Sequence, residues 1–492
     1  MQRIHQPPLD LVRDLCKALE AKGITYCHWK SNAALARSAL GDNDLDLLVD
    51  RASSERFREV LNELGFKEAR LPPGQQLPGV LDYYGYDRES GKIVHVHAHY
   101  RLIVGHDLTK NCHLPIERPY LETAVQGELF RVPTPEFEFI VYVIRMMLKH
   151  ANWSPVLGRH DCLSKGERQE LEYLHSRLNY AELCRVLEEH LPYVDLGSFE
   201  DCVKVLRPDC PHWVRIRAGR RLQSCLQACM RRPQLIDTWL RLWRRGLGAI
   251  ERRAFGYVPC KRMTSGGVIV AIVGGDGAGK STAVQGLWEW LSEEFAVVQA
   301  HMGKPPWSAT TLVVRGILKI GRSLGFYPFT RVPISYALES SALTFPGYPW
   351  LLREVCTARD RYLSYRRARR FADNGGVVIF DRFPLPQVHC MDGPQAERMA
   401  GSQWGNRVAR FLARLEKGYY RPIVPPDVLI LLRVDPETCV MRKRDEDAAS
   451  VRARATEMWK LDLQRLPAHV IDAGKGKAEV LSELKALVWS QL

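Results

Sequence analysis

Two spacings of apolar residues divide the first part of the chain into predicted helices and strands. Over 9–22 an apolar residue recurs every three or four positions, which predicts a helix that Gly23 ends. Similar patterns predict helices over 33–40 and 53–65. Short apolar or alternating runs predict strands over 24–29, 45–49 and 93–104. Helices and strands that alternate at these lengths favour an α/β or α+β domain over 1–135.

The next region, 136–263, has helical periodicity along most of its length. Its last two predicted helices, 215–232 and 235–255, are rich in arginine. Glycine and proline then punctuate 255–267, which predicts a linker. We therefore expect a helical middle region between two domains.

The third region, 264–492, begins with the apolar strand pattern at 267–273. Further strands are predicted at 296–301, 377–380 and 428–434, each separated from the next by a helical segment. This order is typical of a parallel sheet wound by helices. The fold class predicted for the chain is α/β.

Composition limits the class of protein. The chain has 492 residues, of which 46% are hydrophobic and 26% charged, so globular domains are expected and a disordered or fibrous chain is excluded. The net charge is +14, and the stretch 211–262 carries 13 Lys or Arg against two acids, Asp237 and Glu251. This stretch predicts either solvated helix faces or a basic face that binds phosphates, nucleic acid or an anionic membrane.

The cysteines and the hydropathy pattern bear on the compartment. The 13 cysteines form no CxxC pair, and their odd number in a large chain favours reduced thiols. No run of 18 apolar residues occurs, and the N-terminus has no apolar core of signal-peptide length, so we expect no membrane span. A cytoplasmic protein is predicted.

The strongest chemical signal follows the first strand of the third region. The residues there match G-x-x-x-x-G-K-[ST] without a mismatch, between a predicted strand and a predicted helix. Glycines let backbone N–H groups turn toward phosphate oxygens, and the helix N-terminus adds partial positive charge. A lysine can then reach the β- and γ-phosphates of ATP, and a serine hydroxyl can coordinate Mg²⁺. The residues predicted to bind the nucleotide are Gly274, Gly275, Asp276, Gly277, Ala278, Gly279, Lys280, Ser281 and Thr282.

Two further elements complete this predicted site. The strand at 377–380 runs into Asp381 and Arg382, and ligands of parallel sheets bind at the carboxyl ends of strands. Asp381 is predicted to help hold Mg²⁺, and Arg382 to hold an acceptor anion. Arginines after the strand at 428–434 are typical of a mobile lid that stabilises a transferring phosphoryl group, although an ordinary charged helix is the alternative. These arginines are Arg442, Arg444, Arg452 and Arg454.

From 267 to about 473, these motifs resemble the thymidylate kinase-like branch of the P-loop nucleoside monophosphate kinases. The resemblance rests on the glycine-rich motif, on 358–361, on Asp381 and Arg382, and on the arginine-bearing segment. It implies that Arg361 binds the acceptor and that Asp276 lies near it. A homodimer is one option for the assembly, since related kinases are often dimers. Residues 299–305 and Thr357 differ from the family pattern for reading thymine, so the acceptor predicted here is a small molecule that need not be thymidylate.

The first region contains a second candidate site. Asp44 and Asp46 lie two residues apart on a predicted strand, so they share one face and can bind Mg²⁺. With the preceding loop at 29–32, they resemble the nucleotidyltransferase superfamily over about 10–130. The position of the family's third carboxylate falls in a run that holds His95, His97 and His99. These histidines predict a solvated strand face, with a transition-metal site as the alternative.

The leading hypothesis is an ATP-dependent kinase in which Lys280, Asp381, Arg382, Arg442 and Arg444 carry catalysis. One alternative is a nucleotidyltransferase that acts through Asp44 and Asp46. Another is an ATP-switched protein whose basic stretch binds nucleic acid or an anionic surface.

Overall fold

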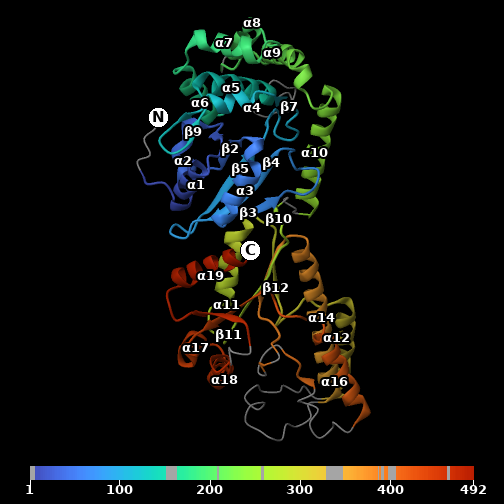
Figure 1. Ribbon diagram of the computed structural model, residues 1–492. Helices are drawn as coiled ribbons and strands as arrows, with labels where there is room; N and C mark the ends of the chain where they lie inside the picture. The colour runs from blue at the N-terminus through green and yellow to red at the C-terminus, as the bar shows by residue number, and fades with distance from the viewer. Residues whose placement is uncertain are drawn as a thin grey trace. The chain divides into compact units, whose positions relative to one another are not determined.

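The computed structural model describes residues 6–150, 163–207, 210–255, 260–327, 347–385, 387–388, 393–396, 406–461 and 466–492. It divides into two compact units, Met1–Pro259 and Cys260–Leu492 (Figure 1). The architecture is mixed α/β, as the sequence predicted.

Unit 1 is built on a mixed sheet. Its strands lie in the order β1-β2-β5-β4-β3, with β2 and β5 parallel and the other neighbouring pairs antiparallel. These strands are β1 (Tyr26–His28), β2 (Leu45–Val49), β3 (Lys67–Arg70), β4 (Val80–Tyr86) and β5 (Ile93–His99). Two short hairpins are formed by β6 (Leu102–Val104) with β7 (Cys112–Leu114) and by β8 (Val125–Gln126) with β9 (Arg131–Val132).

Helices complete unit 1. They are α1 (Asp10–Ala21), α2 (Leu35–Ala39), α3 (Ser54–Glu63), α4 (Glu117–Glu122), α5 (Pro135–His150), α6 (Lys165–His175), α7 (Tyr180–His190), α8 (Leu196–Val205), α9 (His212–Cys225) and α10 (Gln234–Phe255), with short 3₁₀ turns at Asn32–Ala34, Arg51–Ser53 and Gln227–Cys229.

Strand β2 is buried on both faces and separates two hydrophobic cores. Leu45, Leu47 and Val49 pack with α1 and α3, whereas Leu48 packs with α5 and the helices that follow it. The second core joins residues of the predicted first region to those of the helical middle region, so the predicted boundary at 135/136 falls inside unit 1. Asp46 has the side-chain parity of Leu48 and therefore points toward the face that α5 covers.

Unit 2 is a parallel sheet wound by helices. Its strands lie in the order β12-β13-β11-β14-β15, and every neighbouring pair is parallel. The strands are β11 (Ile269–Gly274), β12 (Val297–His301), β13 (Val377–Asp381), β14 (Val428–Arg433) and β15 (Ala468–Asp472), and the short β10 (Arg262–Met263) precedes them.

Two groups of helices accompany this sheet. Helix α11 packs against α19, while α14 packs against both α12 and α16 (Figure 1). The helices are α11 (Lys280–Ser292), α12 (Ala309–Ser323), α14 (Tyr348–Asp373), α16 (Arg407–Tyr420), α17 (Pro436–Arg442), α18 (Ala448–Trp459) and α19 (Lys477–Gln491). The winding brings the ends of β11, β13 and β14 to one edge of the sheet.

Candidate functional sites

The glycine-rich loop connects β11 to α11 in unit 2. Gly277 and Gly279 adopt φ values of +88° and +86°, which favour glycine. A Cβ on Gly275 would lie 2.9 Å from the Ala455 Cα, and one on Gly277 would lie 2.6 Å from the Cys439 carbonyl oxygen. The loop therefore packs directly against α17 and α18, and side chains at these two glycines would push them apart.

Lys280 begins α11 and is largely buried inside the loop. Its Nζ donates to the Gly275 carbonyl oxygen at 2.7 Å and lies 3.5 Å from Asp276 Oδ1. Burial lowers the pKa of Lys280, and the nearby Arg382 lowers it further. A bound anion would relieve both effects, since it would add negative charge beside the ammonium group.

Asp276 is the centre of a charge cluster at the loop. It is 4% exposed and pairs with Arg382 and Arg454, each at 2.7 Å. Burial alone would raise the pKa of Asp276, but Arg382, Lys280 and Arg454 together lower it. Asp276 thus gathers three cations at the loop, and positive charge held together in this way favours an anionic ligand.

Asp381 lies at the end of β13, opposite Ile272 of β11 in the register of the sheet. Ser281 Oγ donates to Asp381 Oδ2 at 3.2 Å. The other carboxylate oxygen, Oδ1, is buried and has no hydrogen-bond partner in the structure. An oxygen with no partner beside a serine hydroxyl fits a magnesium ion, which prefers oxygen ligands.

A pocket of about 230 Å³ lies beside the loop. Apolar side chains of α11, β14 and α19 line it together with the Arg442, Lys475 and Lys477 side chains. Arg442 also donates to the Ala473 carbonyl oxygen at 3.1 Å. An apolar group joined to phosphates on the loop would match this apolar and basic lining.

The other predicted arginines differ in their surroundings. Arg452 makes a two-pronged ion pair with Glu437, at 2.6 and 2.8 Å, and Arg444 is exposed. Arg361 is buried on α14, where it donates to the Met302 and Gly303 carbonyl oxygens at 2.7 and 3.3 Å and to the Tyr420 hydroxyl. Arg382 adopts φ +69°, a left-handed conformation that is uncommon outside glycine.

The histidines of β5 form a second cluster in unit 1, and their interpretation as a solvated strand face is wrong. The side chains of His95 and His99 are 10% and 6% exposed. They lie among carboxylates of β2 and β4, because β5 runs between these two strands. His95 bridges Asp44 at 2.8 Å and Asp82 at 2.9 Å.

Asp46 and His97 occupy the middle of this cluster. Burial would raise the pKa of Asp46, but Lys30, His97 and His99 hold it well below its usual range. Burial lowers the pKa of His99 to about 4. Burial would lower the pKa of His97 as well, but its contacts with Asp46 and Asp82 raise it to about 9. Asp44 thus pairs with His95, whereas Asp46 lies among Lys30, His97 and His99.

Several residues near the sites carry no motif in the sequence. Asp82 lies on β4, a strand that the sequence did not predict because aromatic residues and Gly85 obscure its alternation. Tyr420 is the last residue of α16 and contacts Arg361 only through the tertiary fold. Lys475 comes shortly after the last strand, β15, and its basic side chain was the signal that the sequence offered.

The stretch 211–262 presents more apolar surface than its charge indicates. On α10, Asp237 and Arg241 form an ion pair at 3.0 Å, and Arg244 donates to the Leu108 and Gly74 carbonyl oxygens. The opposite face of the helix exposes the stacked rings of Trp239 and Trp243 among other apolar side chains. Binding of nucleic acid or an anionic surface stays a prediction.

Among the described helices, none combines the length and apolar character that crossing a bilayer requires.

Comparison with known proteins supports a nucleotide-binding chain. No family model matches the sequence. The chain is similar to the uncharacterized ATP-binding protein YghR of Escherichia coli strain K12, with 26% identity over 227 residues that cover 45% of this chain and 86% of YghR. It is also similar to the uncharacterized ATP-binding protein YghS of the same strain, with 28% identity over 197 residues that cover 38% of this chain and 77% of YghS.

Proposed function

We propose that the chain is an ATP-dependent kinase that transfers the γ-phosphoryl group to a small-molecule acceptor. The observation that carries this proposal is the convergence of Lys280, Arg382 and Arg454 on one buried carboxylate at the glycine-rich loop. A site that only bound ATP as a switch would need the loop and its lysine. The two additional arginines, one directly after β13 and one on α18, supply the positive charge that a transferring phosphoryl group requires.

Each group at this edge of the sheet has a role in the proposal. The loop amides and Lys280 bind the β- and γ-phosphates, and the pocket beside Arg442 takes the nucleoside of the donor. Ser281 and Asp381 hold Mg²⁺, which when bound offsets charge on the phosphates. Catalysis of this kind is mainly positioning and electrostatic stabilisation.

The arginines divide between donor and acceptor. Arg454 already reaches the loop through Asp276, so we assign it, rather than the exposed Arg444, to the transferring group. We assign Arg382, which pairs with Asp276 of the loop, to the acceptor. Arg361 is held by two carbonyl oxygens after β12, and there it supplies positive charge for a phosphorylated acceptor.

The test is a transfer assay with γ-labelled ATP, Mg²⁺ and the purified full chain. Nucleoside monophosphates, sugars and oligonucleotides are offered as separate pools. We expect label to move to one small-molecule pool and expect Lys280→Ala to lower the rate by at least about 10²-fold. Transfer that Lys280→Ala leaves unchanged, or ATP binding by the wild type without transfer to any pool, would contradict a kinase.

A further inference from the structure

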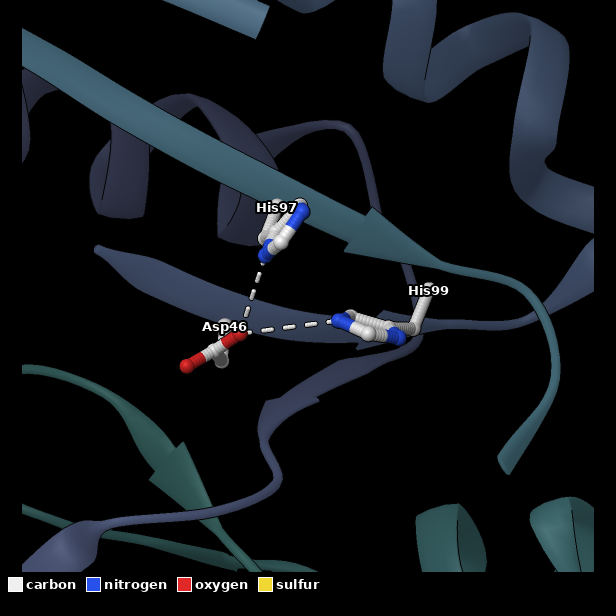
Figure 2. Close-up of side chains that lie close together, drawn as sticks. All are labelled: Asp46, His97 and His99. Carbon is white, nitrogen blue, oxygen red and sulfur yellow. Dashed lines mark ion pairs between the residues drawn. The ribbon is translucent and has the colours of Figure 1, made fainter. Parts of the chain in front are cut away.

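The parallel pairing of β2 with β5 brings three metal-ligand side chains together in unit 1. Asp46 lies directly opposite His97 in the register of these strands. His99 follows two residues later on β5, so it points to the same face as His97. Figure 2 shows both imidazole rings directed toward the Asp46 carboxylate.

The separations between these ligand atoms suit one small cation. Asp46 Oδ1 lies 3.4 Å from His97 Nδ1 and 3.5 Å from His99 Nε2. The three ligand atoms all lie within 4.8 Å of one another. Tetrahedral zinc, with bonds of about 2.0–2.2 Å, places its ligand atoms roughly 3.3–3.6 Å apart. Only small side-chain movements would therefore be needed to close the set around an ion.

His99 supplies independent support for a ligand at this position. It is 5% exposed, and neither of its ring nitrogens has a hydrogen-bond partner in the structure. Buried polar atoms are normally satisfied, because an unmade hydrogen bond costs about 1–3 kcal/mol. The His99 Nε2 faces the Asp46 carboxylate. A cation between these two groups would bind the nitrogen and the carboxylate oxygen together.

The groups behind His97 orient its ring for metal binding. His97 Nε2 lies 2.9 Å from Asp82 Oδ1, on the side of the ring away from Asp46. Asp82 also contacts His95 Nε2 at 2.9 Å, and His95 Nδ1 in turn contacts Asp44 at 2.8 Å. A carboxylate that accepts from the second ring nitrogen fixes the tautomer and the orientation of a ligating histidine.

Lys30 is the competing cation. Its Nζ lies 2.8 Å from Asp46 Oδ1, and its side chain is 25% exposed, so it can turn toward solvent. A metal ion on Asp46 must displace or share this contact. The charge of Lys30 therefore lowers the affinity of the site for any cation.

We propose that Asp46, His97 and His99 bind one divalent transition-metal ion, with Zn²⁺ the best match to the ligand set. Two imidazoles and one carboxylate favour zinc over magnesium, which prefers oxygen ligands. Three protein ligands leave a fourth position for water or a substrate, as at catalytic zinc sites. This proposal is independent of the kinase in unit 2.

The experiment is a metal titration of the full chain after treatment with a chelator. Zn²⁺ is titrated in competition with a chromophoric chelator, and Co²⁺ is added in parallel because its visible spectrum reports tetrahedral coordination. We expect one ion per chain at this site. His97→Gln should weaken binding by at least about 100-fold, and Asp82→Asn, which removes only the orienting carboxylate, by about 10- to 100-fold.

Lys30→Met provides the complementary variant, because it should tighten binding by about tenfold through loss of the competing charge. A merely misfolded protein would not gain affinity. Lys280→Ala, in the other unit, is the matched control and should bind Zn²⁺ as the wild type does. No stoichiometric binding by the wild type, or binding that His97→Gln and Lys30→Met both leave unchanged, would overturn the proposal.

Discussion

Arg454 of α18 pairs with Asp276 of the glycine-rich loop at 2.7 Å. This ion pair joins the arginine-bearing segment to the glycine-rich loop across a long stretch of sequence. Arg454 also pairs with Glu446 at 2.7 Å, so its guanidinium is held between the loop and its own segment. A phosphate on the loop would offer Arg454 a third anion, close to Asp276.

Asp276→Asn should destabilise unit 2. The variant leaves Lys280, Arg382 and Arg454 close together without the carboxylate that they share, which should lower the free energy of unfolding by about 3 kcal/mol. Urea denaturation at pH 7 measures this. The exposed Asp373→Asn is the control and should change stability by less than about 0.5 kcal/mol.

The lowered pKa of Asp276 predicts that the protein loses stability in acid. Because its cationic neighbours lower the pKa of Asp276, its contribution to stability is present above the usual value of 3.8 and is lost as pH falls through the lower folded value. Between pH 5 and pH 2 the wild type should therefore lose more stability than Asp276→Asn. Parallel loss in both proteins would contradict the role assigned to the carboxylate.

Asp381→Asn should raise the Mg²⁺ concentration needed for half-maximal transfer by at least about tenfold. The amide loses the negative charge beside Ser281 that attracts the ion. Excess Mg²⁺ should restore part of the activity. Lys280→Ala serves as the contrast, since added Mg²⁺ should not restore activity there, and an unchanged Mg²⁺ requirement in Asp381→Asn would argue against the assignment.

Gly277→Ala should abolish ATP binding while leaving unit 1 folded. The added Cβ meets the Cys439 carbonyl oxygen at 2.6 Å, and the φ of +88° is strained for alanine. Isothermal titration with ATP and Mg²⁺ measures the loss. Gly316→Ala, on α12 with nothing within 4 Å of its new Cβ, should bind ATP as the wild type does.

Glu138→Gln should remove a loss of stability that unit 1 undergoes as pH rises. Burial raises the pKa of Glu138 from 4.5 to about 7, with Glu170 adding to the shift. The unfolded chain releases this proton first, so this residue lowers the free energy of unfolding as pH rises from about 4.5 to 7. The melting temperature of Glu138→Gln should therefore exceed that of the wild type by more at pH 8 than at pH 5.

The amide of the glutamine can still accept from the Asn32 backbone N–H, which now bonds Glu138 Oε1 at 3.3 Å. Thermal melts of the wild type and Glu138→Gln at both pH values give the comparison. The exposed Glu63→Gln is the control and should show no such difference. An equal effect of Glu138→Gln at pH 5 and pH 8 would rule out the assigned pKa.

Features whose residues are contiguous in the chain could be predicted from the sequence. The loop at 274–282 was visible because its residues are contiguous, and the strand 45–49 was predicted with the bounds that β2 has. The predicted strand 93–104 instead forms β5 and β6, since the chain turns at Tyr100 and Arg101. Strand β4 was missed, and with it Asp82.

The partners of the candidate residues depend on strand order, which periodicity does not reveal. Alternating histidines look like a solvated face unless the neighbours of β5 are known. Here β2 and β4 flank it and bring Asp46 and Asp82 beside His97. Arg382 and Arg454 likewise come from segments that only the wound sheet brings to Asp276, whereas Lys280 follows Asp276 in the same loop.

Because Gly277 packs closely on Cys439, the reactivity of this cysteine should report movement of the glycine-rich loop. The Cys439 side chain is 1% exposed, and burial raises the pKa of its thiol, so the side chain resists alkylation while loop and helix stay in contact. We expect separation of the two to loosen the packing around this side chain and so to expose it to reagent. The rate of thiol labelling at Cys439 would then report how often the glycine-rich loop separates from the helix in the native protein, without an engineered cysteine.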